Sequence, residues 1–157
     1  MSDSPKAEVL AIGIGNSYRS DDGAGLVAAE RLKKQQSKAF RVLTHSADGA
    51  GLMASWQGAE AVVLIDAVQS GAKAGTLYRW DANLESLPAR AFRGSTHAFS
   101  VVEAIEMARV LGQLPQCLIV YGVEGQNFEA GTTLSPEVDS AVSNLVESVL
   151  REILNLT

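Results

Sequence analysis

Three short runs of apolar residues constrain the fold of this chain more than any other feature: Val9–Ile14, Ala61–Ile65 and Cys117–Tyr121. Each run is continuous rather than alternating, which is typical of parallel strands covered on both faces. A weaker strand is expected at Arg41–Thr44 and a fifth at Thr76–Trp80. The segment before the fifth strand is too short for a helical crossover, so we expect that strand to be antiparallel at a sheet edge.

Helical patterns fill the intervals between these strands. We expect helices at Asp22–Lys34, Gly51–Gln57 and Ala98–Leu111, and a last helix that begins at Ser135-Pro136, where serine suits the cap and proline the first turn. The order of elements predicts a single domain over residues 1–157. Its expected fold class is a three-layer α/β/α sandwich around a mostly parallel, twisted five-stranded sheet with one antiparallel edge strand.

Composition and charge exclude several classes of protein. The formal net charge is −5 and no run is rich in Lys or Arg, which argues against a nucleic-acid partner. No apolar stretch approaches the ~20 residues that cross a bilayer, and the N-terminus lacks the apolar core of a signal peptide. The single cysteine, Cys117, excludes an intrachain disulfide and lies in an apolar run, as a small core residue would. We therefore predict a cytoplasmic location and no membrane partner.

The stretch AIGIGNSYRSDDGAG, residues 11–25, raises the question of nucleotide binding. Gly13 and Gly15 begin like a dinucleotide-binding loop, but Tyr18 stands where the third glycine is required. The Gly-Lys-Ser/Thr sequence of a phosphate-binding loop is absent. Asp21 and Asp22 at the start of the expected helix would repel phosphate, so a nucleotide site is disfavoured.

Three side chains are expected at the carboxyl ends of the strands, where ligands gather in such sheets. Asp22 follows the first strand, Asp66 ends the strand at Ala61–Ile65, and His97 stands at the start of the helix before the last strand. Two carboxylates and one imidazole suit a zinc or nickel ion and leave coordination positions open for water or substrate. These three residues are the candidate metal-contacting and catalytic set.

Each candidate also has a purely structural explanation. Asp22 could favour the dipole of the helix that follows, Asp66 could bond to the backbone of the next turn, and His97 could be a packed or cap-region histidine. Structural or surface roles are expected for three further polar residues: Asp21 as a helix cap or solvated acid, His45 at the end of a weak strand, and Asp48 in a turn.

Taken in order, four motifs resemble those of the hydrogenase maturation endopeptidases, which trim the C-terminal extension from the large-subunit precursor of nickel–iron hydrogenases. They are GIGNSYRSDDGAG over residues 13–25, LIDAV over 64–68, STH over 95–97 and VYGVE over 120–124. The resemblance implies one endoproteolytic cut after nickel has been inserted into the precursor. It implies that Asp22, Asp66 and His97 contact that nickel, or another divalent metal in its place.

One segment departs from the family pattern. Many members carry a D-G-G-T-x-G loop after the second strand, whereas this chain has THSADGAG over residues 44–51, with Thr44 at the position of the loop's aspartate. This replacement and the segment 52–60 resemble relatives that act on cytoplasmic, NAD-linked hydrogenases. The expected partner is therefore the large-subunit precursor of a cytoplasmic, NAD-linked nickel–iron hydrogenase.

Two rival functions use the same residues and stay open from the sequence. A nickel-dependent chaperone or binding module would hold the precursor without cutting it. A small-molecule hydrolase on a similar sheet would act on simple substrates in a deep pocket. In the protease itself, either a carboxylate or the metal could activate the attacking water.

Overall fold

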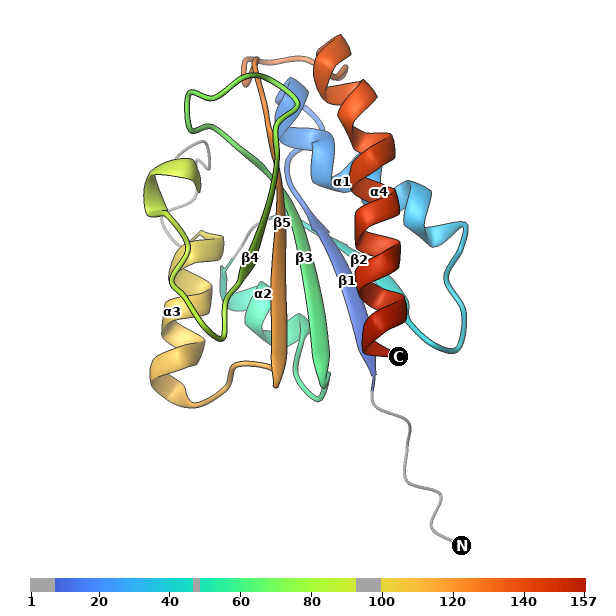
Figure 1. Ribbon diagram of the computed structural model, residues 1–157. Coiled ribbons are helices and arrows are strands. Elements are labelled where there is room, and N and C mark those ends of the chain that lie inside the picture. Colours follow the sequence, from blue (N-terminus) through green and yellow to red (C-terminus); the bar gives the residue numbers. More distant parts are fainter. Residues whose placement is uncertain (1–7, 47–48, 93–99) are drawn as a thin grey trace, which may run out of the picture.

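The computed structural model describes residues 8–46, 49–92 and 100–157 and contains the five-stranded sheet predicted from the sequence. The strands are β1 (Val9–Ile14), β2 (Arg41–His45), β3 (Ala61–Val68), β4 (Leu77–Asp81) and β5 (Cys117–Glu124). They lie in the order β2-β1-β3-β5-β4 (Figure 1). All neighbouring pairs are parallel except β4 and β5, so the antiparallel edge strand is confirmed.

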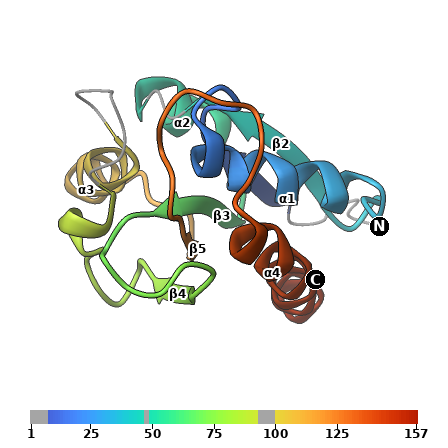
Figure 2. The ribbon, with the colours of Figure 1, turned by 90° about the horizontal axis from the view of Figure 1, so that it is seen from above.

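Helices cover both faces of the sheet. Helices α1 (Ala24–Lys33) and α4 (Pro136–Leu156) pack on one face, and α2 (Gly49–Ser55) and α3 (Val101–Leu111) pack on the other (Figures 1 and 2). The predicted three-layer arrangement is therefore confirmed. None of the helices in the described part of the chain is long and apolar enough to cross a membrane.

The continuous apolar runs follow from burial on both faces of the sheet. In β3, Val63 and Ile65 belong to the core under α1 and α4, whereas Val62 and Leu64 belong to the core under α2 and α3. Successive side chains of a strand point to opposite faces, so a strand covered twice has no polar face. The predicted apolar face of the last helix is also buried: Val138, Val142, Leu145, Val146, Val149 and Ile153.

The ends of several elements differ from the predicted ones. β3 continues to Val68, so Asp66 lies inside the strand, opposite Gly122 of β5, rather than at its end. Helix α1 begins at Ala24, after a 3₁₀ turn over Ser20–Gly23, and not at Asp22. The strand continues past Asp66 because Ala67 and Val68 are themselves buried against the two cores.

Helix α3 begins at a capping box. The N–H of Ser100 donates to the carboxylate of Glu103 at 3.0 Å, and the hydroxyl of Ser100 also donates to it. The N–H of Glu103 in turn bonds to the side chain of Ser100, and this reciprocal arrangement stabilises the first turn of the helix. The predicted helix began at Ala98, which lies outside the described residues. Gly112, with a φ of 68°, ends α3 as predicted.

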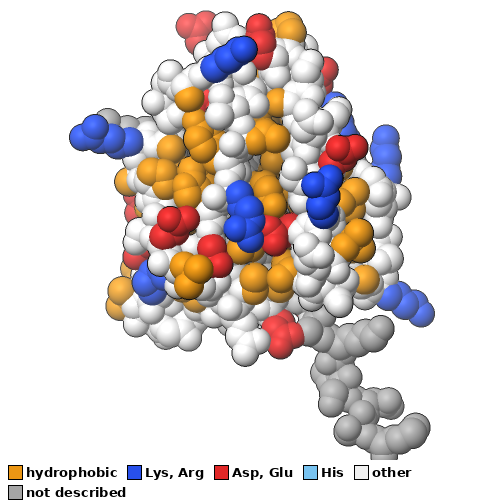
Figure 3. All heavy atoms as spheres, in the orientation of Figure 1, with side chains coloured by type: hydrophobic (Ala, Val, Ile, Leu, Met, Phe, Trp, Pro, Cys, Tyr) orange, Lys and Arg blue, Asp and Glu red, His pale blue; other side chains and the backbone are white. Residues whose placement is uncertain are grey.

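Charges of both signs are mixed on the surface that β4 and α4 present. Figure 3 shows Lys and Arg side chains interspersed with Asp and Glu among hydrophobic and neutral groups on this face. One pair is Arg79 on β4, whose Nε lies 2.6 Å from the carboxylate of Glu152 on α4. No basic patch of the kind that nucleic-acid binding requires is visible on this view of the described residues.

Candidate active site

Two glycines let the backbone of α1 come into direct contact with the backbone at the carboxyl ends of β1 and β3. A Cβ on Gly25 would lie 2.4 Å from the carbonyl oxygens of both Ile14 and Ile65, and a Cβ on Gly13 would lie 2.3 Å from the carbonyl oxygen of Gly25. No larger residue fits at either position. The close approach brings the 3₁₀ turn before α1, with Asp22, onto the strand ends beside Asp66.

Gly15 shapes the loop that leads into this turn. Its φ is 156°, and a Cβ there would lie 2.0 Å from the carbonyl oxygen of Asp22. The same carbonyl accepts a hydrogen bond from the N–H of Asn16 at 3.3 Å, and the N–H of Asp22 donates to the carbonyl of Arg19 at 3.1 Å. The loop therefore folds back against the backbone of Asp22. These contacts fix the position of the Asp22 main chain, from which its carboxylate extends.

The Asp22 side chain is largely buried at the strand ends, with 14% of it exposed. Its Oδ2 atom lies 3.8 Å from the guanidinium of Arg19. It makes no cap for α1, because the residue in the N-cap position of that helix is Gly23. Asp22 lies in the first turn of the 3₁₀ segment that leads into α1, so the helix dipole still favours its negative charge.

Asp66 lies beside Asp22 in a low-dielectric environment. It is 9% exposed and shares the sheet face of Val62 and Leu64. Burial above all, and then the negative charge of Asp22, raise the pKa of Asp66 well above its usual value, while a hydrogen bond from the N–H of Ala67 opposes the shift. The structure therefore brings two of the three predicted residues together as an interacting pair of carboxylates.

Such a pair has a defined chemistry. Two carboxylates that repel each other in a buried site bind a proton or a cation more readily than either would alone. A strongly shifted acid with a specific charge partner is also typical of functional sites. Asp22 and Asp66 are thus suited to contact a cation or to act as general base and acid.

His97 lies outside the described residues, as do Ser95 and Thr96 of the predicted motif. Within residues 8–46, 49–92 and 100–157, no group of three or more His, Cys, Asp or Glu residues is arranged to hold a metal ion. The proposed set needs His97 as its third member. It therefore stays a prediction.

Asp21 was misjudged from the sequence. It is neither a helix cap nor a solvated acid but fully buried, at 0% exposure. Its Oδ2 accepts hydrogen bonds from the N–H groups of Gln126 and Asn127 at 2.8 and 2.9 Å and from the hydroxyl of Ser135 at 2.8 Å. Its Oδ1 accepts from the N–H of Ser135 at 2.7 Å. Asp21 therefore joins the turn that carries Asp22 to the segment between β5 and α4.

Burial and hydrogen bonds act on the pKa of Asp21 in opposite directions. Burial favours its neutral form, but the donors from Ser135, Asn127 and Gln126 together outweigh this effect and lower the pKa of Asp21. The two adjacent acids therefore have different roles: Asp21 is a hydrogen-bonded structural anion, and the charge of Asp22 acts on Asp66.

Further hydrogen bonds attach the same two segments. The N–H of Ser20 donates to the carbonyl of Gly131 at 3.0 Å, and the N–H of Gly131 donates to the carbonyl of Tyr18 at 3.0 Å. The hydroxyl of Ser20 donates to the carbonyl of Glu129 at 2.9 Å. Ser20 has a φ of 52°, a left-handed conformation that these bonds hold in place.

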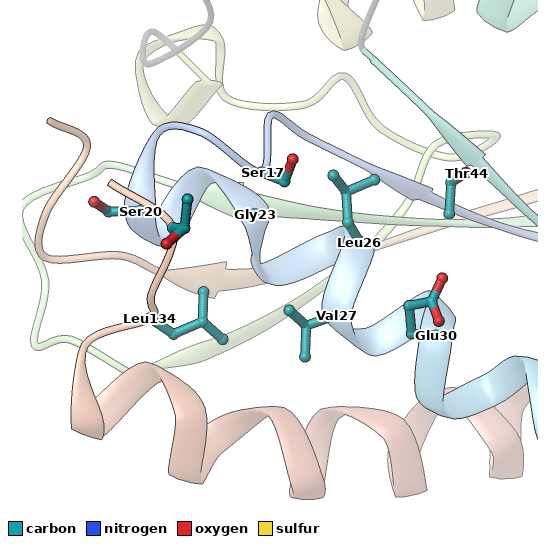
Figure 4. A pocket seen from close by; sticks show the side chains of 9 residues that line it. Ser17, Ser20, Gly23, Leu26, Val27, Glu30, Thr44 and Leu134 are labelled. Atoms are coloured by element: carbon teal, nitrogen blue, oxygen red, sulfur yellow. The ribbon is translucent and has the colours of Figure 1, made fainter. Parts of the chain in front are cut away.

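A surface hollow of about 310 Å³, here called the α1 hollow, adjoins this turn (Figure 4). Figure 4 shows Leu26, Val27 and Glu30 along α1 and Leu134 on the segment that enters α4. A neighbouring hollow of about 410 Å³ extends past Thr44 and His45 at the end of β2. The complete lining of the α1 hollow is Ser17, Ser20, Gly23, Leu26, Val27, Glu30, Thr44, Thr132 and Leu134.

Another carboxylate near the rim is fully engaged. Glu124, at the end of β5, is 1% exposed, and its carboxylate accepts hydrogen bonds from the N–H of Ser70 at 2.8 Å, from the Ser70 hydroxyl and from the Tyr78 hydroxyl at 3.0 Å. The glutamate of the VYGVE motif therefore holds the loop between β3 and β4. This loop lines a third hollow of about 450 Å³.

Three further residues singled out from the sequence are His45, Asp48 and Cys117. His45 ends β2 half-buried; its carbonyl accepts a hydrogen bond from the N–H of Gly15 at 3.1 Å, and its Nδ1 is buried without a hydrogen-bond partner among the described residues. Asp48 lies outside the described residues. Cys117 packs partly buried against the core, and burial raises its thiol pKa, so it is not an activated nucleophile.

Comparison with known proteins identifies a family to which the sequence of this chain is similar. The model described as HycI, hydrogenase maturation protease, matches residues 27–152. Related proteins include the hydrogenase expression/formation protein HupD of Thiocapsa roseopersicina, 28% identical over 146 residues, which cover 91% of this chain and 66% of that protein. Protein HoxM of Cupriavidus necator is 28% identical over 142 residues, with 88% and 70% covered. The chain thus spans about two thirds of the length of these relatives.

Solved structures share the fold over nearly the whole chain. The hydrogenase maturating endopeptidase HybD of Escherichia coli has a TM-score of 0.79 at 21% identity, with 94% of this chain and 93% of that chain covered. The [NiFe] hydrogenase maturation protease HycI of Thermococcus kodakarensis KOD1 has a TM-score of 0.70 at 25% identity, with 97% and 95% covered. The match to the family model begins at residue 27, within α1, so the turn that carries Asp22 lies before the matched residues.

Proposed function

The chain belongs to the hydrogenase maturation protease family, and we propose that it cuts the C-terminal extension from the large-subunit precursor of a nickel–iron hydrogenase after nickel insertion. The sequence motifs predicted this family and its enzyme class, an endopeptidase of hydrogenase maturation. The match to the family model confirms both predictions. The substrate, the site residues and the role of nickel belong to the proposal. It places the reaction in the cytoplasm, on a precursor of the NAD-linked type.

The observation that carries the proposal is the electrostatic coupling of Asp22 and Asp66 at the carboxyl ends of β1 and β3. A nickel ion borne by the precursor is a cation that would relieve the repulsion within this pair. Carboxylate oxygens and an imidazole nitrogen suit nickel or another divalent metal, and His97 supplies the imidazole in this proposal. In it, these three residues recognise the metal of the substrate and are the catalytic set.

Recognition of the metal would also place the scissile bond. If Asp22 and Asp66 contacted the precursor's metal, the peptide next to that metal would be held against the rim, and the attack on it would become effectively intramolecular. The raised pKa of Asp66 makes this carboxyl a candidate to hold or transfer a proton at this rim when no cation contacts it. In this scheme a carboxylate could act as general base on the attacking water, or the metal could supply the activation.

The test is incubation of the protein with nickel-loaded and nickel-free precursors, followed by mass spectrometry of the products. The proposal predicts a single C-terminal truncation of the nickel-loaded form alone. A precursor that is bound in stable complex but keeps its full mass would support the binding-module alternative instead. Truncation at equal rates with and without nickel would contradict nickel-based recognition.

A further inference from the structure

We propose that the α1 hollow binds an extended segment of the precursor flanking the scissile bond, with an aliphatic side chain against Leu26, Val27 and Leu134 and a Lys or Arg side chain beside Glu30. This inference rests on the proposed function, because it names where the polypeptide of that substrate lies. Four features of the hollow carry it: its position, its backbone, its rigidity and its charge.

The position of the hollow connects it to the candidate site. Ser20 and Gly23 line the hollow, and they flank Asp21 and Asp22 in the same 3₁₀ turn. The hollow continues into its neighbour at the end of β2, with which it shares Ser17 and other lining residues. The two hollows therefore adjoin each other, and the first of them lies against the turn that carries Asp22.

The backbone of the walls is available for pairing with a peptide. Ser17 and Thr132 are both exposed lining residues, and no hydrogen bond within the described part of the chain engages the main chain of either. The main-chain groups of the turn at Ser17 and the bend at Thr132 can therefore form hydrogen bonds with a bound peptide. Leu26, Val27 and Leu134 are half-buried and provide the apolar pocket.

The walls are also held in place before any ligand binds. The segment with Thr132 and Leu134 is attached to the turn before α1 through the hydrogen bonds of Asp21 with Ser135 and of Ser20 with Gly131. A preformed site loses less conformational entropy on binding than one that must order its loops. The hollow is therefore a built feature of the fold rather than a gap between loosely placed loops.

The charge of Glu30 indicates which kind of side chain would fit beside it in the hollow. Glu30 is exposed, lines the hollow and has no ion-pair partner among the described residues. The neighbouring Arg31 is engaged elsewhere, since its guanidinium lies 3.2 Å from the carboxylate of Asp139 and 3.3 Å from the hydroxyl of Ser143 on α4. A negative carboxylate beside an apolar pocket favours a peptide with a basic residue near an aliphatic one.

Kinetics of the nickel-loaded precursor test the charge. Glu30→Lys should raise KM about tenfold with little change in kcat, because an attractive rim contact becomes repulsive. The effect should shrink at high salt. Glu147→Lys, which makes the same charge change at an exposed position of α4, should leave KM unchanged. Replacing one basic residue of the precursor's cut region by Glu should restore the KM of the Glu30→Lys protein.

Equal KM values for the Glu30→Lys and Glu147→Lys proteins would overturn the assigned charge contact. A failure of any single reversal in the precursor to restore KM would overturn it as well. Both substitutions lie on exposed helix positions, so loss of folding does not complicate the comparison.

Photo-crosslinking tests the location without requiring cleavage. Benzoylphenylalanine in place of Thr132 should crosslink to the segment of the precursor around the cut, identified by mass spectrometry, whereas the same group in place of Glu147 should not. Crosslinks to another region of the precursor, to a second copy of this chain, or to nothing would overturn the inference. If the wild-type protein fails to cut but the Thr132 crosslink forms at this segment, the proposed function fails and the binding site stands.

Discussion

The carboxylate of Asp21 accepts hydrogen bonds from both the backbone N–H and the hydroxyl of Ser135, at 2.7 and 2.8 Å, across 114 positions of sequence. Ser135 is the N-cap residue of α4, yet its hydroxyl serves Asp21 rather than its own helix. One buried acid therefore holds the start of α4 against the turn that carries Asp22. This contact therefore helps to hold the candidate site in place.

Replacement of Asp21 by Asn should destabilise the protein by about 2–4 kcal/mol at neutral pH, because buried donors lose a charged acceptor. The pKa of Asp21 is lowered in the folded state, so its contribution is present above its unfolded pKa and is lost as pH falls through its folded pKa. Urea denaturation should therefore show the difference between wild type and Asp21→Asn shrinking in acid. A difference that is constant from pH 7 to pH 3 would contradict this account.

Replacement of Asp66 by Asn should have the opposite effect on stability. The pKa of Asp66 is raised on folding, so its ionised form opposes folding, and stability due to this group increases as pH falls through the folded pKa. Asp66→Asn should raise the melting temperature at neutral pH by about 2–6 °C. The exposed Asp139 offers a control, since Asp139→Asn should give no increase. A lower melting temperature for Asp66→Asn would show that its charge is compensated.

Replacement of Gly25 by Ala should cost about 1–3 kcal/mol of stability, because its Cβ would lie 2.4 Å from two strand carbonyls. Gly23→Ala is a matched control two residues earlier: its nearest contact would be 3.4 Å and its φ is −83°. Chemical denaturation should separate the two variants clearly. Equal stabilities would mean that α1 moves away from the sheet without cost.

Replacement of Glu124 by Ala should loosen the loop between β3 and β4 rather than unfold the protein. The carboxylate is the acceptor for Ser70 and Tyr78, so its loss frees the loop at Ser70 and costs about 1–3 kcal/mol. Hydrogen exchange should become faster at Ser70 and in the following residues, while the amides of β1 stay protected. Unchanged exchange at Ser70 would mean that other contacts hold the loop.

The sequence was sufficient to predict the fold because each strand and helix has a local pattern. Continuous apolar runs mark the doubly covered strands, and Ser135-Pro136 marks the start of α4. The extra residues of β3 were missed because Asp66 interrupts the apolar run, although Ala67 and Val68 resume it. Gly122 opposite Asp66 in the sheet gives no sequence signal of that pairing.

The site was predictable only in part, for a physical reason. Asp22 and Asp66 could be placed on one rim from the topology of a parallel sheet, and their interaction in the structure agrees with that placement. The role of Asp21 depends on partners more than 100 positions away, which no local pattern reveals. The position of His97 stays a prediction, because it lies outside the described residues.

The intact mass of a nickel-loaded large-subunit precursor, followed after mixing with each protein variant, tests the central claim most directly. The wild-type protein and the exposed-site control Asp139→Asn should shorten the precursor, whereas Asp22→Asn, Asp66→Asn and His97→Ala should leave its mass unchanged while staying folded. Normal shortening by both Asp22→Asn and Asp66→Asn would contradict the assignment of this carboxylate pair as the site of the reaction.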